Sequence, residues 1–179
     1  MRKAAALILA LALLTACGQS ARQQWQIVPQ IYGNAAEETG KTVSLSTELP
    51  QGWGAELFLM ENGTQQLVLK DEKGELGTVT VYRDDGDTYE QLIGHNMLWL
   101  FPEDLYKAVC DAAEKCSYAD LEYPAKSREY TEPEARFYSM RLYQLQFDGW
   151  VVSADMILYE NDENAVTNCE EFIRGLECQ

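Results

Sequence analysis

Few residues of this 179-residue chain have the types and spacing that enzymatic catalysis requires. The one histidine, His95, stands in the run Gly94-His95-Asn96, and a lone histidine is more often a structural or surface residue than a general base. The sequence has no Gly-x-Ser-x-Gly, phosphate-loop or Gly-x-Gly-x-x-Gly motif. We therefore predict a non-enzymatic protein without catalytic residues. Because carboxylates are abundant, a surface hydrolase that uses an acid pair is the alternative.

The N-terminus has the order of a secretory signal. Two basic residues precede an apolar run over residues 4–14, and two small residues come directly before Cys17. Residues 4–16 would span only about 20 Å as a helix, which is short of the roughly 30 Å hydrocarbon core of a bilayer. We therefore expect residues 1–16 to be a removable export signal and not a retained membrane helix.

Cys17 ends the run Leu14-Thr15-Ala16-Cys17, which resembles the lipobox of bacterial lipoprotein precursors. The resemblance implies that the Cys17 thiol receives a diacylglyceryl group and that a signal peptidase cuts directly before it. Two acyl chains hold a protein firmly, since each buried CH₂ contributes roughly 0.8 kcal/mol and one chain gives only marginal attachment. The expected location is the extracytoplasmic face of a cell membrane, with ordinary secretion as the alternative.

Four further cysteines are candidates for disulfide bonds, because exported proteins with an even number of cysteines usually pair them. They are Cys110, Cys116, Cys169 and Cys178. On one helix, Cys110 and Cys116 would lie about 9 Å apart along the axis, beyond the roughly 7 Å that a bridge tolerates between Cα atoms. We expect a bridge between the middle of the chain and its C-terminal helix, with a Cys169–Cys178 link left open. A zinc site is not predicted, because no two of these ligands have the close spacing that such sites use.

Acidic runs and aromatic residues are weaker candidates for binding sites. The runs 84–87 and 160–164 offer oxygen ligands, but neither matches a calcium loop with its closing glutamate. The four tryptophans, with ten tyrosines, could form a platform for sugar stacking; they are Trp25, Trp53, Trp99 and Trp150. Trp150 falls on the apolar face of an expected strand, where core packing explains it. No metal or cofactor is predicted.

The charge of the chain excludes one class of partner. The sequence has 14 Lys and Arg against 29 Asp and Glu, which gives a formal net charge of −15. A surface of this kind repels nucleic acid and anionic lipid headgroups. The expected partners are therefore the membrane, through the lipid on Cys17, and a protein of the cell envelope.

Period-two patterns and turn signals predict six strands and two helices in the remainder of the chain. The strands are expected over 42–49, 55–61, 65–70, 76–83, 137–147 and 150–159. Asn62-Gly63 and Asp148-Gly149 are typical hairpin turns. One helix is expected over 102–116, with proline and acidic residues in its first turn, and one over 165–174, before Gly175. The apolar residues in 89–101 fit neither the two-residue period of a strand nor the 3.6-residue period of a helix.

Strands that occur in runs, with helices in the middle and at the end, predict the α+β class. We expect one domain over 42–179, with a single twisted antiparallel sheet and two helices packed on one face. Residues 17–41 are expected to be the lipidated N-terminus and a tether that partly docks on the domain.

An apolar strand over 43–49 leads into Pro50-Gln51-Gly52-Trp53, and Leu76-Gly77-Thr78-Val79-Thr80-Val81 follows later in the chain. This order resembles the opening of PsbP-like lipoprotein domains. The resemblance implies a closing helix near 164–176, an adaptor or assembly role, and no catalytic residues. The predicted function is therefore that of a lipid-anchored binding or assembly module.

Overall fold

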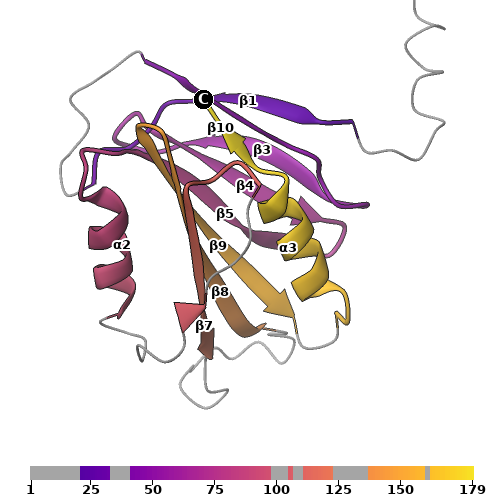
Figure 1. Cartoon of the computed structure of the whole chain (residues 1–179). Coiled ribbons are helices and arrows are strands. Elements are labelled where there is room, and N and C mark those ends of the chain that lie inside the picture. The colour runs from indigo at the N-terminus through magenta and orange to yellow at the C-terminus, as the bar shows by residue number, and fades with distance from the viewer. Residues whose placement is uncertain (1–20, 33–40, 98–104, 107–110, 123–136, 160–161) are drawn as a thin grey trace, which may run out of the picture.

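The computed structural model describes residues 21–32, 41–97, 105–106, 111–122, 137–159 and 162–179 (Figure 1). These residues form two antiparallel sheets and two helices. The larger sheet has the strand order β3-β4-β5-β9-β8-β7-β6, and the smaller one has the order β1-β2-β10. The described residues are mostly strand, so the predicted α+β class and its single sheet are both wrong.

Most strands of the larger sheet occur where the sequence pattern predicted them. Their bounds are β3 (Gly54–Leu59), β4 (Gln65–Asp71), β5 (Gly74–Arg83), β6 (Leu105–Tyr106), β7 (Lys115–Glu122), β8 (Phe137–Phe147) and β9 (Trp150–Tyr159). Gly63 and Gly149 have φ angles of 82° and 75°, which the predicted hairpin turns require. The two long strands and their turn are thus confirmed.

The smaller sheet consists of β1 (Gln23–Ile27), β2 (Val43–Thr47) and β10 (Glu177–Cys178). Strand β1 lies in the segment expected to tether the domain, and all five of its residues pair with β2. On the other side of β2, the C-terminal residues Glu177 and Cys178 pair with Ser46 and Leu45. Both ends of the described chain therefore meet on one strand.

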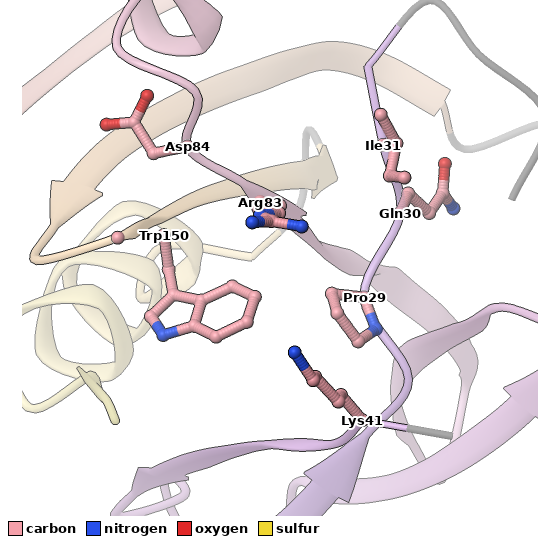
Figure 2. A pocket seen from close by; sticks show the side chains of 8 residues that line it. Pro29, Gln30, Ile31, Lys41, Arg83, Asp84 and Trp150 are labelled. Carbon is pink, nitrogen blue, oxygen red and sulfur yellow. The ribbon is translucent and has the colours of Figure 1, made fainter. Parts of the chain in front are cut away.

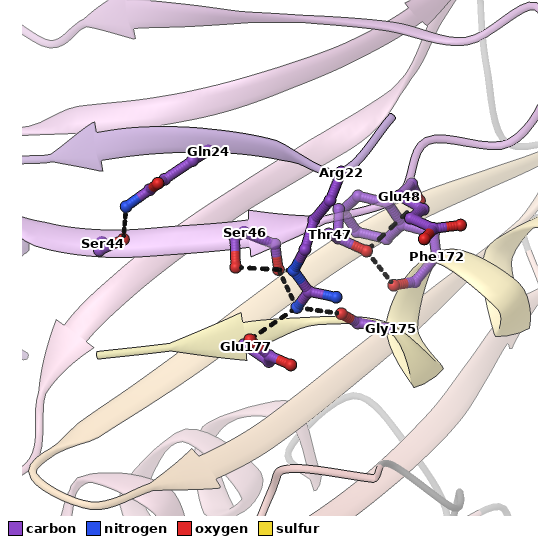
Figure 3. Close-up of polar contacts among 9 residues, drawn as sticks. All are labelled: Arg22, Gln24, Ser44, Ser46, Thr47, Glu48, Phe172, Gly175 and Glu177. Carbon is purple, nitrogen blue, oxygen red and sulfur yellow. Dashed lines mark hydrogen bonds and ion pairs between the residues drawn. The ribbon is translucent and has the colours of Figure 1, made fainter. Parts of the chain in front are cut away.

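The Arg22 side chain connects the start of β1 to β2 and to the C-terminal end of the chain (Figure 3). Its guanidinium donates a hydrogen bond to the Gly175 carbonyl at 3.0 Å, and it forms an ion pair with Glu177 at 2.9 Å. The same side chain also donates to the Ser46 hydroxyl at 3.2 Å. Each contact is exposed and weak by itself, but together they join β1 to β2 and to the end of the chain.

The main hydrophobic core lies between the larger sheet, the smaller sheet and α3 (Ala165–Arg174). Alternate residues of β9 show which face of the sheet is involved, because successive side chains of a strand point to opposite faces. Val152 belongs to the main core, whereas Val151 packs in a second cluster with Tyr89 and Leu92 of α2 (Thr88–Met97). The two helices therefore cover opposite faces of the sheet, and the prediction that they share one face is wrong.

The helix predicted over 102–116 is also wrong in the part that the structure describes. Residues 105–106 form β6, and Lys115 and Cys116 begin β7, which pairs with β8 along its whole length. The local helix signals near Pro102 are outweighed by this strand pairing, which a local pattern does not reveal. The helix of this region is α2 (Thr88–Met97), which lies in the segment whose apolar residues matched neither a strand nor a helix pattern. The predicted C-terminal helix is confirmed as α3.

Candidate functional site

A pocket forms where the chain crosses from the smaller sheet to the larger one. Strand β4 begins at Gln65, so the end of β5 has no β4 residue beside it, and the segment after β1 fills that place. The Gln30 amide donates to the Val81 carbonyl at 2.7 Å, and the Arg83 amide donates to the Gln30 carbonyl at 2.9 Å. This short parallel pairing holds the crossing segment against β5 and forms one wall of the pocket.

The pocket has a volume of about 350 Å³. It is lined by Pro29, Gln30, Ile31, Lys41, Arg83, Asp84, Gly149 and Trp150. Figure 2 shows the Lys41 and Arg83 side chains beside the Trp150 indole, with Pro29 on the adjoining wall. Arg83 and Trp150 come together because they are paired across β5 and β9. The pocket thus combines two cationic groups with a flat aromatic surface.

The carboxylate on the rim of the pocket already has donors for both of its oxygens. Asp84 Oδ2 accepts a hydrogen bond from Gln146 Nε2 at 2.7 Å, and Oδ1 accepts one from the Gly86 amide at 2.9 Å. Lys41 and Arg83 bring two positive charges to the pocket lining and Asp84 brings one negative charge, so the lining is positive by one charge in a chain with a net charge of −15. Such a site favours an anionic group, and the indole and proline favour a flat or apolar part next to it.

A second charged cluster lies between α3 and the edge of the larger sheet. The Arg141 guanidinium contacts both Asp120 oxygens, at 2.5 and 2.7 Å, and one Glu170 oxygen at 3.4 Å. Its Cζ atom lies 4.2 Å from the centre of the Tyr118 ring. Both carboxylates neutralise one buried cation, so this arrangement is suited to holding α3 on the sheet and not to transferring protons.

The predicted cysteine sites are only partly within the described residues. Cys17 and Cys110 lie outside them. No disulfide joins any two of the three described cysteines, which are Cys116 in β7, Cys169 in α3 and Cys178 in β10. The predicted bridge between two helices rested on a helical Cys116, which is wrong; the pairing of Cys110 stays a prediction. Burial raises the pKa of Cys169 and of Cys178 to about 12.

The other candidates do not come together as one site. His95 lies in α2, Trp53 packs on Phe172 with 6.0 Å between ring centres, and Trp25 is in β1. Trp99 lies outside the described residues. The acidic run at 84–87 forms the turn before α2, where Asp85 accepts a hydrogen bond from Thr88 at 2.8 Å. Within the described part of the chain, no group of three acidic, histidine or cysteine side chains is placed to hold a metal ion.

Two of the pocket residues, Trp150 and Asp84, were singled out from the sequence, whereas Pro29, Lys41 and Arg83 were missed. Each of the missed residues stands in a different segment and has no motif around it. The one local signal is that Arg83 ends β5 and Trp150 begins β9, while Lys41 lies two residues before β2, so that all three are near strand ends, where side chains from separate strands can meet. None of the helices in the described ranges has the length and apolar character needed to cross a membrane.

Comparison with known proteins supports the fold alone. No protein-family model matches the chain, and neither does any curated protein sequence. The structure is similar to a crystal structure from Bacteroides thetaiotaomicron VPI-5482 at 1.50 Å resolution, with a TM-score of 0.51 and 13% sequence identity. The match covers 75% of this chain and 45% of that one, so the chain spans less than half of its structural relative. The predicted resemblances to lipoproteins stay predictions.

Proposed function

We propose that this protein is a lipid-anchored, extracytoplasmic binding module that holds a small anionic ligand in the pocket formed by Lys41, Arg83 and Trp150. The proposal is carried by one observation: the Lys41 and Arg83 side chains and the Trp150 indole line the same pocket of about 350 Å³. An anionic group is attracted by the ammonium and guanidinium, while the indole contributes contact area to a flat ring. Ligands that combine a carboxylate with a sugar or aromatic ring have this chemistry.

The proposed anchor would keep this module close to the membrane. Near the start of the described chain, Arg22 contacts Ser46, Gly175 and Glu177 of the domain. Five residues lead from Cys17 to Arg22, and a fully extended chain spans at most about 3.6 Å per residue. The lipidated cysteine would therefore lie within about 18 Å of the domain surface. A short attachment of this kind suits a protein that works at the envelope.

A non-enzymatic role fits the described residues better than the alternative of a hydrolase. Asp120 and Glu170 are the two carboxylates that the described ion pairs bring together, and both face the same arginine. A glycosidase needs one carboxyl that is protonated and one that is ionised. Here both carboxylates contact the same Arg141 guanidinium, so the cluster is an ion-pair network and not a pair of carboxyls set on either side of a substrate.

The test is ligand binding measured by calorimetry with matched pairs of compounds. Glucuronate is compared with glucose, and benzoate with benzyl alcohol, so that each pair differs mainly in the carboxylate. We expect the acidic member of at least one pair to bind, and the Lys41→Gln and Arg83→Gln variants each to weaken that binding by about tenfold, which corresponds to the loss of one charge-assisted contact.

Trp150→Leu separates stacking from charge, because it should weaken ligands with a ring more than it weakens inorganic phosphate. Lys73→Gln is the matched control, since Lys73 is an exposed lysine in the β4–β5 turn, away from the pocket lining. The proposal fails if neutral and acidic members bind equally, or if Lys73→Gln weakens binding as much as Lys41→Gln does.

A further inference from the structure

Strand β3 forms an open edge of the larger sheet. It stands at the end of the strand order, and β4 is the one described strand that pairs with it. In the same register, the Met60 amide donates to the Thr64 carbonyl at 2.9 Å. Hydrogen-bonded pairs alternate along an antiparallel ladder, so the backbone groups of Phe58 face β4, whereas those of Leu57 and Leu59 point to the open edge.

The same edge exposes three consecutive large apolar side chains. The exposed fractions are 38% for Leu57, 58% for Phe58 and 65% for Leu59. Leu57 pairs with the core residue Leu67, so the two leucines lie on the face of the main core and Phe58 lies on the opposite face. Ala55, the preceding residue on the core face, packs against the main core, so the cover of that face ends there. Apolar surface is therefore exposed on both faces of the edge.

Strand β3 lacks the features that usually keep an open edge from pairing. Such edges commonly carry charged side chains, a proline or a bulge. Glu56 is the one charged residue between Gly54 and Leu59, and its carboxylate is paired with Lys70 of β4. The register of β3 with β4 runs through the strand without a shift. The edge is thus suited to pairing with a further strand.

The exposed run Leu57-Phe58-Leu59 is palindromic, which makes the edge complementary to itself. When two copies pair antiparallel about a two-fold axis at Phe58, the two Phe58 side chains lie opposite each other. Each Leu57 then lies opposite a Leu59, and their outward backbone groups exchange hydrogen bonds in the correct phase. Glu56 lies opposite Met60. The two Glu56 residues are about 14 Å apart along the strands, beyond the roughly 8 Å screening length at physiological salt.

We propose that β3 is the interface of a homodimer, in which two copies join their larger sheets edge to edge about a two-fold axis at Phe58. The palindrome favours a second copy as the occupant, because a partner of different sequence requires no such symmetry. The three side chains expose on the order of 300 Å² per copy, so the dimer buries on the order of 600 Å² of side-chain area, below the roughly 1,200 Å² of stable interfaces. The dimer is therefore transient, and a covalent trap detects it better than a measurement of size.

The experiment is disulfide trapping in cells that make the full chain, with copper-phenanthroline as the oxidant. In the proposed register, the two Phe58 residues form a pair with about 4.5 Å between their Cα atoms, which a disulfide spans. Two copies of Leu57 are two residues out of register, beyond the roughly 7 Å limit. We expect Phe58→Cys to give at least about fivefold more covalent dimer than Leu57→Cys or Val166→Cys. Val166 is the matched control, because it is an exposed apolar residue of α3, and the wild type gives the background from the native cysteines.

A second substitution tests the contact itself. Adding Leu59→Asp to Phe58→Cys should reduce the covalent dimer to the background, because the new carboxylate would lie opposite Leu57 of the second copy. Both positions are exposed, so we expect urea denaturation to give the same midpoint for these variants as for the wild type, which separates pairing from folding.

Three results would overturn the proposal. In the first, Phe58→Cys gives no more dimer than Val166→Cys. In the second, Leu57→Cys gives as much dimer as Phe58→Cys, so that the edges meet without the proposed register. In the third, the trapped product has a mass other than twice that of the chain, which means that a different protein occupies the edge. None of these results bears on ligand binding by the Lys41–Arg83–Trp150 pocket.

Discussion

Replacing Asp120 with asparagine tests whether the Arg141 cluster holds α3 on the sheet. The Arg141 side chain is only 9% exposed, and Asp120 supplies two of its three carboxylate contacts, at 2.5 and 2.7 Å. Removing one partner of a buried pair costs about 3–5 kcal/mol. The Asp120 side chain is 37% exposed and Glu170 stays in place, so water and the second carboxylate reduce this cost. We expect a loss of about 2–3 kcal/mol.

Glu170→Gln is the matched control within the same cluster. Its single contact is longer, at 3.4 Å, and the Glu170 side chain is 45% exposed, so we expect a loss of at most about 0.5 kcal/mol. Arg141→Met combined with Asp120→Asn should recover part of the stability, because the uncompensated charge is then absent. Urea denaturation at pH 7 measures all three variants, provided that the slope with denaturant is unchanged.

The reasoning is refuted if Asp120→Asn costs less than Glu170→Gln, or if the double variant is less stable than Asp120→Asn alone. Either result would mean that the Arg141 charge is already well solvated. Catalytic hydrolysis that disappears in Asp120→Asn without loss of stability would favour the alternative function instead.

Four further predictions concern separate parts of the chain. Cys17→Ala should abolish incorporation of labelled palmitate, and continued labelling would contradict the proposed anchor. Cys169 and Cys178, with pKa values of about 12, should have only about one thiolate in 10,000 at pH 8 and react with iodoacetamide far more slowly in native than in denatured protein. Gly77→Ala should cost at least ~2 kcal/mol of unfolding free energy in urea denaturation, because φ is 151° and a Cβ would lie 2.2 Å from the Asp155 carbonyl oxygen. Burial raises the pKa of the Asp155 carboxyl above its usual 3.8 in the folded state. The stability that Asp155 contributes is therefore present below pH 3.8 and is lost as the pH rises through the folded-state pKa. Relative to the wild type, Asp155→Asn should gain stability between pH 4 and 7, as measured by denaturation at a series of pH values.

The hairpin of β8 and β9 was predictable because its information is local. Alternating apolar residues indicate the strands, and Asp148-Gly149 supplies the turn between them. The smaller sheet was not predictable in this way, since its central strand β2 takes one partner from residues 23–27 and the other from the last residues of the chain. Leu45 pairs with Cys178, which is more than 130 positions away in the sequence, and nothing in the residues around either one indicates this partner.

The same limit applies to a row of polar residues across the larger sheet, in which the register places Gln66, Thr80, Ser153 and Gln144 directly beside one another. Gln66, Thr80 and Gln144 each alternate with apolar neighbours, so each resembles an ordinary solvent-facing position of a strand. Only the register between strands makes them one row, and a shift of a single residue in one strand would place its polar side chain in the core face instead. The burial of Gln144, whose Oε1 atom has no hydrogen-bond partner in the described structure, follows from this long-range arrangement, so no sequence pattern predicts it.

Strand β1 links the proposed anchor to the anion pocket. Arg22, five residues after the proposed lipid site at Cys17, precedes the strand, and Pro29 of the pocket follows it. Seven residues of extended chain cover about 24 Å at roughly 3.4 Å per residue. Because β1 is paired along its length with β2, this spacing is rigid. A pocket at the Arg22 end would be held within reach of the lipid headgroups, whereas one at the Pro29 end can be held in the aqueous phase. The fold thus allows a short lipid attachment and a water-accessible pocket in the same small domain.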